Sequence, residues 1–259
     1  MAVKALVLKA PGTNCDEETV WALSKAGAKV EVRYFVDLEL HPEILERFGL
    51  LFLPGGFSYG DYLGSGKVWA LFLESALGDR LRRFVEQGRM LIGVCNGFQV
   101  LVKMGLLPGN GHGKTGSEDK PAVSLTSNAS GRFECRWVPL KLEENSIFLN
   151  RLAPRRPGAL AFSFDLPIAH AEGRFMASSP DTLRWLDAKG LVFLRYNGIN
   201  PNGSTDNIAG ITNVGGNVIG LMPHPERWVI REQHYDWQGQ RNIQPWGLEF
   251  LRAIVRMAR

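Results

Sequence analysis

Short apolar runs alternate with helix-like stretches over about the first 100 residues of the chain. The apolar runs are bounded by Gly, Pro or charged residues, which is typical of strands. Residues 16–25 and 67–87 lie between such runs and carry helix-forming side chains, and the first stretch opens with acidic residues that suit a helix dipole. This alternation predicts a parallel sheet with helices on both faces. The predicted strands are residues 3–8, 29–35, 49–53 and 90–94.

The second half of the chain follows a different pattern. Residues 109–130 are rich in Gly, Ser, Lys and Asp, so we expect an exposed connection there. Residues 132–221 then supply mostly strand-like segments. Residues 246–259 carry apolar side chains at helical spacing and predict an amphipathic helix at the end of the chain.

Composition and charge narrow the function classes. With 259 residues and 45% hydrophobic side chains, the chain can bury a sizeable core as one large domain or two small ones. The net charge is +4, but the basic residues are scattered, and proline and glycine break the densest basic stretch, 151–158. We therefore expect no nucleic-acid partner. No apolar run approaches the roughly 20 residues that span a bilayer, and no basic-then-apolar leader is present, so we expect a cytoplasmic protein with no membrane partner.

Among the three cysteines, Cys95 has the spacing of a nucleophile. It lies between Gly93 and Gly97, where a predicted strand gives way to a helical pattern, and this arrangement matches a nucleophile elbow. The glycines allow close backbone approach around a strained turn, and a helix N-terminus favours the thiolate. The alternative is a buried structural cysteine. We interpret Cys15 and Cys135, which lack this setting, as structural.

A cysteine nucleophile needs a base and a group that orients the base. His224 follows a predicted strand, and the prolines on either side of it keep the backbone extended, so that Glu226 projects to the same side. His170 has the same His-x-Glu spacing with Glu172. The residue pattern alone leaves both histidines open as the base.

The chain resembles the class I glutamine amidotransferases at these positions. "GVCNGFQ" (93–99) is similar to the signature around their nucleophile, and "MPHPER" (222–227) is similar to their distal His-x-Glu signature. Further motifs narrow the resemblance to the glutaminases of phosphoribosylformylglycinamidine synthase, in purine biosynthesis. These are "APGTNCDEE" (10–18), "PGGFSYGDYLGSG" (54–66), "NASGRFECRW" (128–137), "LPIAHAEGRF" (166–175), "NPNGS" (200–204) and "IAGITNVGGNVIGLMPHPER" (208–227).

The resemblance covers nearly the whole chain and implies a fold and a site. The implied fold is a single glutaminase domain over residues 1–259, a flavodoxin-like α/β fold with a mostly parallel central sheet flanked by helices and an additional antiparallel β region. Its site lies at the carboxyl ends of the parallel strands. The resemblance implies Cys95 as nucleophile, His224 as general base and Glu226 as the partner of that base. By the same resemblance, Gly56 and Asn96 provide backbone donors to the oxyanion, and Gln99 shapes the glutamine pocket.

The implied reaction is hydrolysis of L-glutamine to glutamate and ammonia through a cysteine thioester. The ammonia passes to a synthetase subunit, which converts formylglycinamide ribonucleotide to the amidine. A further small subunit is a second candidate partner. We expect ATP and Mg²⁺ on the synthetase subunit, and no cofactor or metal site in this chain. One departure is Gly64, where many small-subunit relatives have arginine. The alternatives are a free-standing cysteine hydrolase and a non-catalytic regulatory subunit.

Overall fold

The computed structural model describes residues 2–109, 121–152, 163–239 and 243–259. Within these ranges a nine-stranded sheet has the order β2-β1-β3-β4-β11-β10-β9-β6-β7, and β5 pairs separately with β8. The strands are β1 Lys4–Lys9, β2 Lys29–Tyr34, β3 Leu50–Leu53, β4 Met90–Val94, β5 Val123–Thr126, β6 Glu134–Leu142, β7 Ser163–His170, β8 Arg174–Ala177, β9 Val192–Tyr196, β10 Ile208–Thr212 and β11 Val218–Leu221. The helices are α1 Asp16–Lys25, α2 Phe35–Leu40, α3 Lys67–Glu86, α4 Asn96–Lys103, α5 Ile147–Leu152, α6 Pro180–Ala188 and α7 Trp246–Met257.

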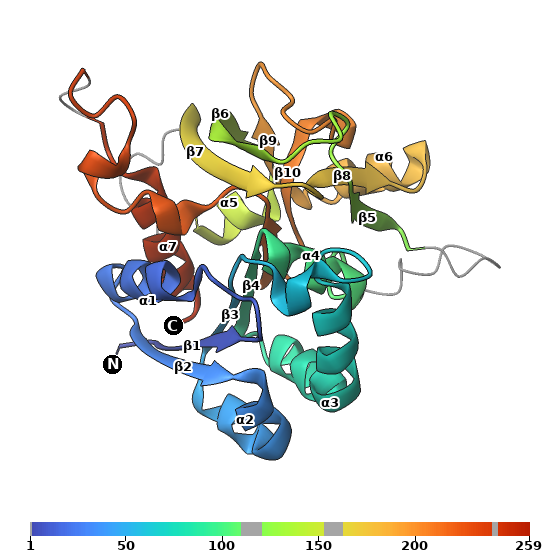
Figure 1. Cartoon of the computed structure of the whole chain (residues 1–259), viewed down its shortest axis with the longest axis vertical. Coiled ribbons are helices and arrows are strands. Elements are labelled where there is room, and N and C mark those ends of the chain that lie inside the picture. The colour runs from blue at the N-terminus through green and yellow to red at the C-terminus, as the bar shows by residue number, and fades with distance from the viewer. Residues whose placement is uncertain (1, 110–120, 153–162, 240–242) are drawn as a thin grey trace.

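The large sheet has a parallel half and an antiparallel half. Strands β2, β1, β3, β4 and β11 pair in parallel, and the strands from β10 to β7 continue the sheet in antiparallel order. Helix α1 packs beside α7, whereas α3 packs with α2 and α4, and β3 and β4 lie between the two groups (Figure 1). The described residues therefore form the expected α/β architecture with its additional antiparallel β region.

The parallel strands were the most predictable part of the chain. All four strands expected in the first part form within one or two residues of their expected bounds, as do the helices α1 and α3. Strands β3, β4 and β11 are buried along their whole length, as expected for parallel strands covered on both faces. No described helix is long and apolar enough to cross a membrane.

The prediction of an exposed connection over residues 109–130 is wrong for its last third. Val123–Thr126 forms β5, which pairs antiparallel with β8, and the side chains of Val123 and Leu125 are buried. Four residues of apolar–polar alternation were hidden by the polar residues before them. Residues 110–120, and residues 153–158 of the basic stretch, lie outside the described residues.

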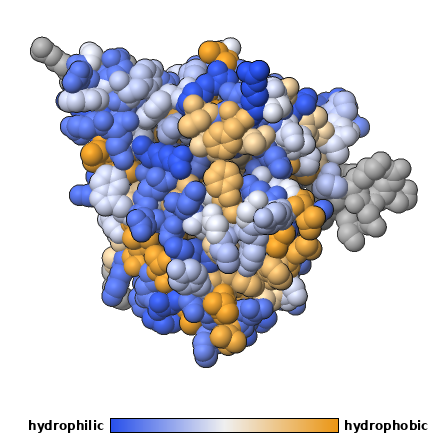
Figure 2. Space-filling model, in the orientation of Figure 1, coloured by the Kyte–Doolittle hydropathy of each residue, from blue (hydrophilic) through white to orange (hydrophobic). Residues whose placement is uncertain are grey.

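Hydrophilic side chains cover most of the face seen in Figure 1, and apolar side chains form separate patches among them (Figure 2). Large exposed apolar side chains in the described part include Tyr62 and Leu63, which are 76% and 77% exposed. Both belong to the loop that follows β3.

Helix α4 packs very closely on the strands before it. An added Cβ at Gly97 would lie 2.0 Å from the carbonyl oxygen of Leu53, and one at Gly93 would lie 2.5 Å from the carbonyl oxygen of Gly97. These contacts involve backbone atoms, which cannot move aside as a flexible side chain can. The two glycines therefore set the distance between α4 and the central strands.

We predict that Gly97→Ala destabilises the chain by at least about 3 kcal/mol, the upper end of overpacking costs, because its methyl group meets the Leu53 backbone. Gly78→Ala is the matched control, since Gly78 lies inside α3 and the atoms nearest to a Cβ there belong to the flexible ends of Arg82 and Glu74. We expect the free energy of unfolding of Gly78→Ala to be unchanged or raised by up to about 1 kcal/mol. Urea unfolding of both variants measures this, and equal stability of the two would contradict the packing argument.

Candidate active site

Cys95 lies on a sharp turn between β4 and α4. Its backbone has φ 50° and ψ −106°, a left-handed conformation that is strained for a residue other than glycine. The Cys95 N–H still donates to the Leu221 carbonyl at 2.8 Å, so the turn begins directly at the end of the sheet. The side chain is 5% exposed. The strained turn is the geometry that a nucleophile elbow requires.

His224 and Glu226 lie beside this turn because β11 pairs in parallel with β4. Leu221 is in register with Val94, so both strands end at the same edge of the sheet. The His224 Nδ1 atom is 2.6 Å from Glu226 Oε1, and both side chains are buried. An added Cβ at Gly55 would lie 2.8 Å from His224 Cε1 and 3.4 Å from Cys95 Cβ. The imidazole and the cysteine thus meet around a glycine that leaves room for both.

The electrostatics of His224 follow from these neighbours. Burial alone would lower its pKa, but the Glu226 carboxylate and the nearby Cys95 sulfur outweigh burial and hold the pKa well above the ordinary 6.5. A raised pKa favours the protonated form of the imidazole. A protonated imidazole is suited to stabilise a neighbouring thiolate and to donate a proton to a leaving group.

The second histidine of the sequence analysis has different surroundings. His170 lies at the end of β7, and its Nδ1 is 3.1 Å from the side-chain oxygen of Asn128. Burial and the neighbouring His224 lower its pKa to about 3. Glu172, its expected partner, instead accepts from the Ser65 N–H at 3.1 Å, and His170 makes no ion pair within the described ranges. The structure thus gives a buried carboxylate partner to His224 and an amide partner to His170.

Asn96 and Gln99 lie on the first turns of α4. The Asn96 amide nitrogen donates to Asp61 Oδ1 and to Gln99 Oε1, both at 3.1 Å, and the Gln99 amide donates to the Glu172 carbonyl at 2.6 Å. Ser58 Oγ donates to the Asn96 side-chain oxygen at 2.5 Å. These bonds fix the side chain of Asn96, while its backbone N–H belongs to the first turn of a helix, where amides lack intrahelical acceptors.

Gly56 begins the loop that supplies these contacts. It has φ +139°, and an added Cβ there would lie 2.7 Å from the Asn14 backbone nitrogen. Gly64 in the same loop has φ +111°, a conformation in which an arginine would be strained. The sequence analysis did not single out Ser58 and Asp61 from this loop. The sequence signal that could have identified them is the presence of two polar side chains in a segment with several glycines.

The interpretation of Cys15 as a structural cysteine agrees with its burial, but its neighbours also place it at the site, and Cys135 is not buried. Cys15 is buried, an Arg227 Nη atom is 3.2 Å from its sulfur, and an added Cβ at Gly55 would be 3.1 Å from that sulfur. It therefore lies beside the catalytic candidates. Burial raises the pKa of its thiol, although the neighbouring His224 opposes that shift. Cys135 is exposed on β6 and contributes nothing to the core.

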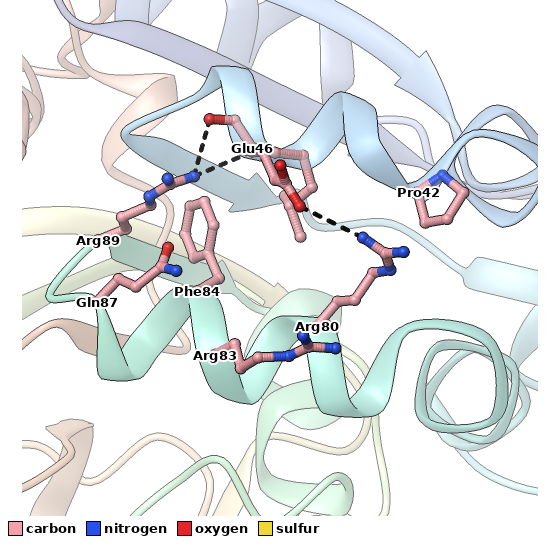
Figure 3. Close-up of a pocket in the computed structure, with 8 residues that line it drawn as sticks. Pro42, Glu46, Arg80, Arg83, Phe84, Gln87 and Arg89 are labelled. Atoms are coloured by element: carbon pink, nitrogen blue, oxygen red, sulfur yellow. Dashed lines mark hydrogen bonds and ion pairs between the residues drawn. The ribbon is translucent and has the colours of Figure 1, made fainter.

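A separate pocket lies between α3 and the short 3₁₀ helix Pro42–Arg47 (Figure 3). Arg89 donates to the backbone carbonyl of Glu46 at 3.0 Å, and Arg80 lies 3.5 Å from the Glu46 carboxylate. Arg80 of α3 and Arg89, which follows α3, thus hold the 3₁₀ helix in place, and Cys95 does not line this pocket.

Comparisons with known proteins agree with this geometry. The model of the CobB/CobQ-like glutamine amidotransferase domain family matches residues 2–255. The chain is 39% identical to phosphoribosylformylglycinamidine synthase subunit PurQ of Dehalococcoides mccartyi, over 99% of this chain and 98% of the relative. It is 43% identical to a protein of that name from Thermus thermophilus, over 96% of this chain and 98% of the relative.

Two solved structures extend the comparison to the fold. A chain in the structure of PurLQS from Thermotoga maritima aligns over 100% of both chains with a TM-score of 0.74 and 32% identity. A glutamine amidotransferase from the same organism, 15% identical, has a TM-score of 0.55 over 100% of this chain and 99% of its own, which shows the fold alone. The predicted fold class is confirmed.

We predict that the His224 ring is protonated at pH 7 and that Glu226→Gln lowers its pKa, because an amide cannot replace the carboxylate charge. A histidine with a raised pKa stabilises the fold fully below pH 6.5, and this contribution is lost as the pH rises through the raised pKa. Imidazole nitrogen NMR across a pH titration measures both effects. His170, with a pKa of about 3, is the internal control and should stay neutral throughout. A neutral His224 at pH 7 in the unmodified chain would refute the assignment.

Proposed function

Since this chain belongs to the PurQ family of phosphoribosylformylglycinamidine synthase subunits, within the CobB/CobQ-like glutamine amidotransferases, we propose that Cys95, His224 and Glu226 carry out its glutamine hydrolysis. The protein is the glutaminase subunit of that synthase and acts in purine biosynthesis with the synthetase subunit PurL and a small subunit, PurS. The observation that carries the residue assignment is the buried His224–Glu226 pair beside a cysteine held on a strained turn.

The first half of the reaction acylates the cysteine. The Cys95 thiolate attacks the side-chain carboxamide carbon of glutamine, and the backbone N–H groups of Gly56 and Asn96 donate to the oxyanion that forms. His224 gives its proton to the leaving nitrogen, and ammonia departs from a γ-glutamyl thioester. Glu226 stabilises the protonated imidazole and keeps it oriented.

The second half releases glutamate. His224, now neutral, takes a proton from water, and the water oxygen attacks the thioester carbonyl in the same oxyanion site. Collapse of the intermediate frees the Cys95 sulfur. Ammonia released into bulk water at neutral pH is mostly ammonium and cannot attack, so the product must pass to the synthetase subunit by a shielded route.

Further expectations fit this proposal. A thiol, an imidazole and backbone donors are sufficient for glutamine hydrolysis. We therefore propose that this chain binds no cofactor and that ATP and Mg²⁺ bind to the partner. A reduced Cys95 fits a cytoplasmic location. One sheet contains β2 from the start of the chain and β7 from its second half, which supports a single domain over residues 1–259. Gln99, which borders the Glu172 carbonyl, is proposed to shape the glutamine pocket.

The loop after β3 connects the site to a surface where the partner could dock. It supplies Ser58 and Asp61, which hold Asn96, and it also exposes Tyr62 and Leu63. A partner that contacts these exposed side chains would act on the loop that positions the oxyanion donors. A free-standing hydrolase would need no such surface.

We predict that Cys95→Ala lowers glutamine-dependent synthesis by at least about 1,000-fold in the reconstituted complex, while synthesis from added ammonium salt persists, because only the ammonia source is lost. His224→Ala should resemble it, whereas His170→Ala should retain measurable turnover. Cys135→Ala, at an exposed thiol, is the matched control and should behave as the unmodified chain. Retained glutaminase activity in Cys95→Ala would disprove the nucleophile assignment.

A further inference from the structure

A second sulfur lies next to the catalytic histidine, and the proposed mechanism does not use it. Cys15 is 1% exposed and comes from the turn just before α1. Four side chains meet here, and each offers one potential ligand atom within 4.8 Å of the other three. They are Cys15, Glu18, His224 and Glu226. Thiolate sulfur, imidazole nitrogen and carboxylate oxygen are the ligands that Zn²⁺ takes in proteins.

Two buried polar atoms of this cluster have no hydrogen-bond partner among the described residues. They are His224 Nε2 and Glu226 Oε2, in side chains that are 1% and 0% exposed. Buried polar atoms are almost always satisfied, so an orphaned imidazole nitrogen beside a thiol and a carboxylate points to a ligand. Glu226 already holds Nδ1 of the imidazole, which leaves Nε2 as the free coordinating atom. A carboxylate behind a metal-bound histidine is the usual arrangement at zinc sites.

The charges of the cluster also suit a divalent cation. With Cys15 ionised and the His224 ring neutral, as both are once a metal is bound, Cys15, Glu18 and Glu226 carry three negative charges. The Arg227 guanidinium, 2.9 Å from Glu18 and 3.2 Å from Cys15, carries one positive charge. The remaining double negative charge matches a zinc-class ion. In a tetrahedral site with bonds of about 2.0–2.3 Å, neighbouring donors lie roughly 3.3–3.8 Å apart, so donor atoms that lie up to 4.8 Å apart need to close by at most about 1–1.5 Å.

The surface offers an entry path to this cluster. The side chains of Glu18 and Arg227 are 35% and 31% exposed, and Glu18 lies on the first turn of α1. A cation can meet the Glu18 carboxylate at the surface and pass inward to Cys15 and His224.

We propose that Cys15, Glu18 and His224 form an inhibitory site for a zinc-class divalent cation, with Glu226 holding the imidazole from behind. This inference rests on the proposed function, because inhibition follows from the role of His224. Binding forms bonds from the metal to Cys15 Sγ and His224 Nε2, and a proton leaves each atom for solvent. The occupied imidazole can then neither donate a proton to ammonia nor accept one from water.

The spectroscopic test uses the full-length chain with Cys95→Ala and Cys135→Ala, so that Cys15 is the only thiol. Co²⁺ replaces Zn²⁺ as the probe, because a cobalt–thiolate bond gives near-ultraviolet charge-transfer absorption. We expect about one equivalent of Co²⁺ to produce the band, Zn²⁺ to displace it, and a further Cys15→Ser change to abolish it. Absence of the band in the folded Cys15-only chain, with folding checked by circular dichroism, would overturn the proposal.

The kinetic test uses the complex with the synthetase subunit and compares each variant with its own metal-free rate. Loss of a group that merely supports a metal ligand weakens binding by about 10–100-fold, so Cys15→Ser should raise the Zn²⁺ concentration for half-inhibition at least tenfold. Glu18→Gln, which keeps all three thiols, should also raise the Zn²⁺ concentration for half-inhibition. Cys135→Ser should leave that concentration unchanged. Equal inhibition of the unmodified chain and Cys15→Ser would place the metal on Cys95 instead, and would overturn the proposal while leaving the proposed function intact.

Discussion

The parallel pairing of β4 with β11 is the contact on which the active site depends. It aligns Val94 with Leu221, so that a cysteine and a histidine from distant parts of the sequence emerge at one edge of the sheet. Buried parallel strands with fixed register cannot slip by one residue without turning every side chain to the opposite face. The positions of Cys95 and His224 are therefore set by the core, not by the loops that carry them.

Close packing and buried charge then convert this alignment into a reactive site. Gly93 and Gly97 let α4 approach the strands, and Gly55 leaves the space in which the imidazole and the cysteine meet. The Glu226 carboxylate is fully buried, and its bond to His224 Nδ1 partly offsets the cost of that burial. The raised pKa of His224 is the electrostatic consequence of keeping this carboxylate in the core.

Much of this was readable from the sequence where local patterns are strong. The buried strands show as apolar runs, and the elbow shows as a cysteine between two glycines. The choice between His224 and His170 was not readable from spacing, because both precede a glutamate by two residues. It depends on where each glutamate points, and Glu172 turns toward Ser65 instead of toward His170. Strand β5 was missed because its short alternation follows a long polar stretch. The place of Cys15 beside His224 was missed because it depends on partners distant in sequence.

The most direct test of this account is to trap the covalent intermediate. The complex is mixed with glutamine, quenched in acid within one turnover, and digested for mass spectrometry. The account predicts a γ-glutamyl adduct on the peptide that contains Cys95 and no adduct on the peptide that contains Cys15. A γ-glutamyl group on Cys15, or turnover without any adduct on Cys95, would contradict it.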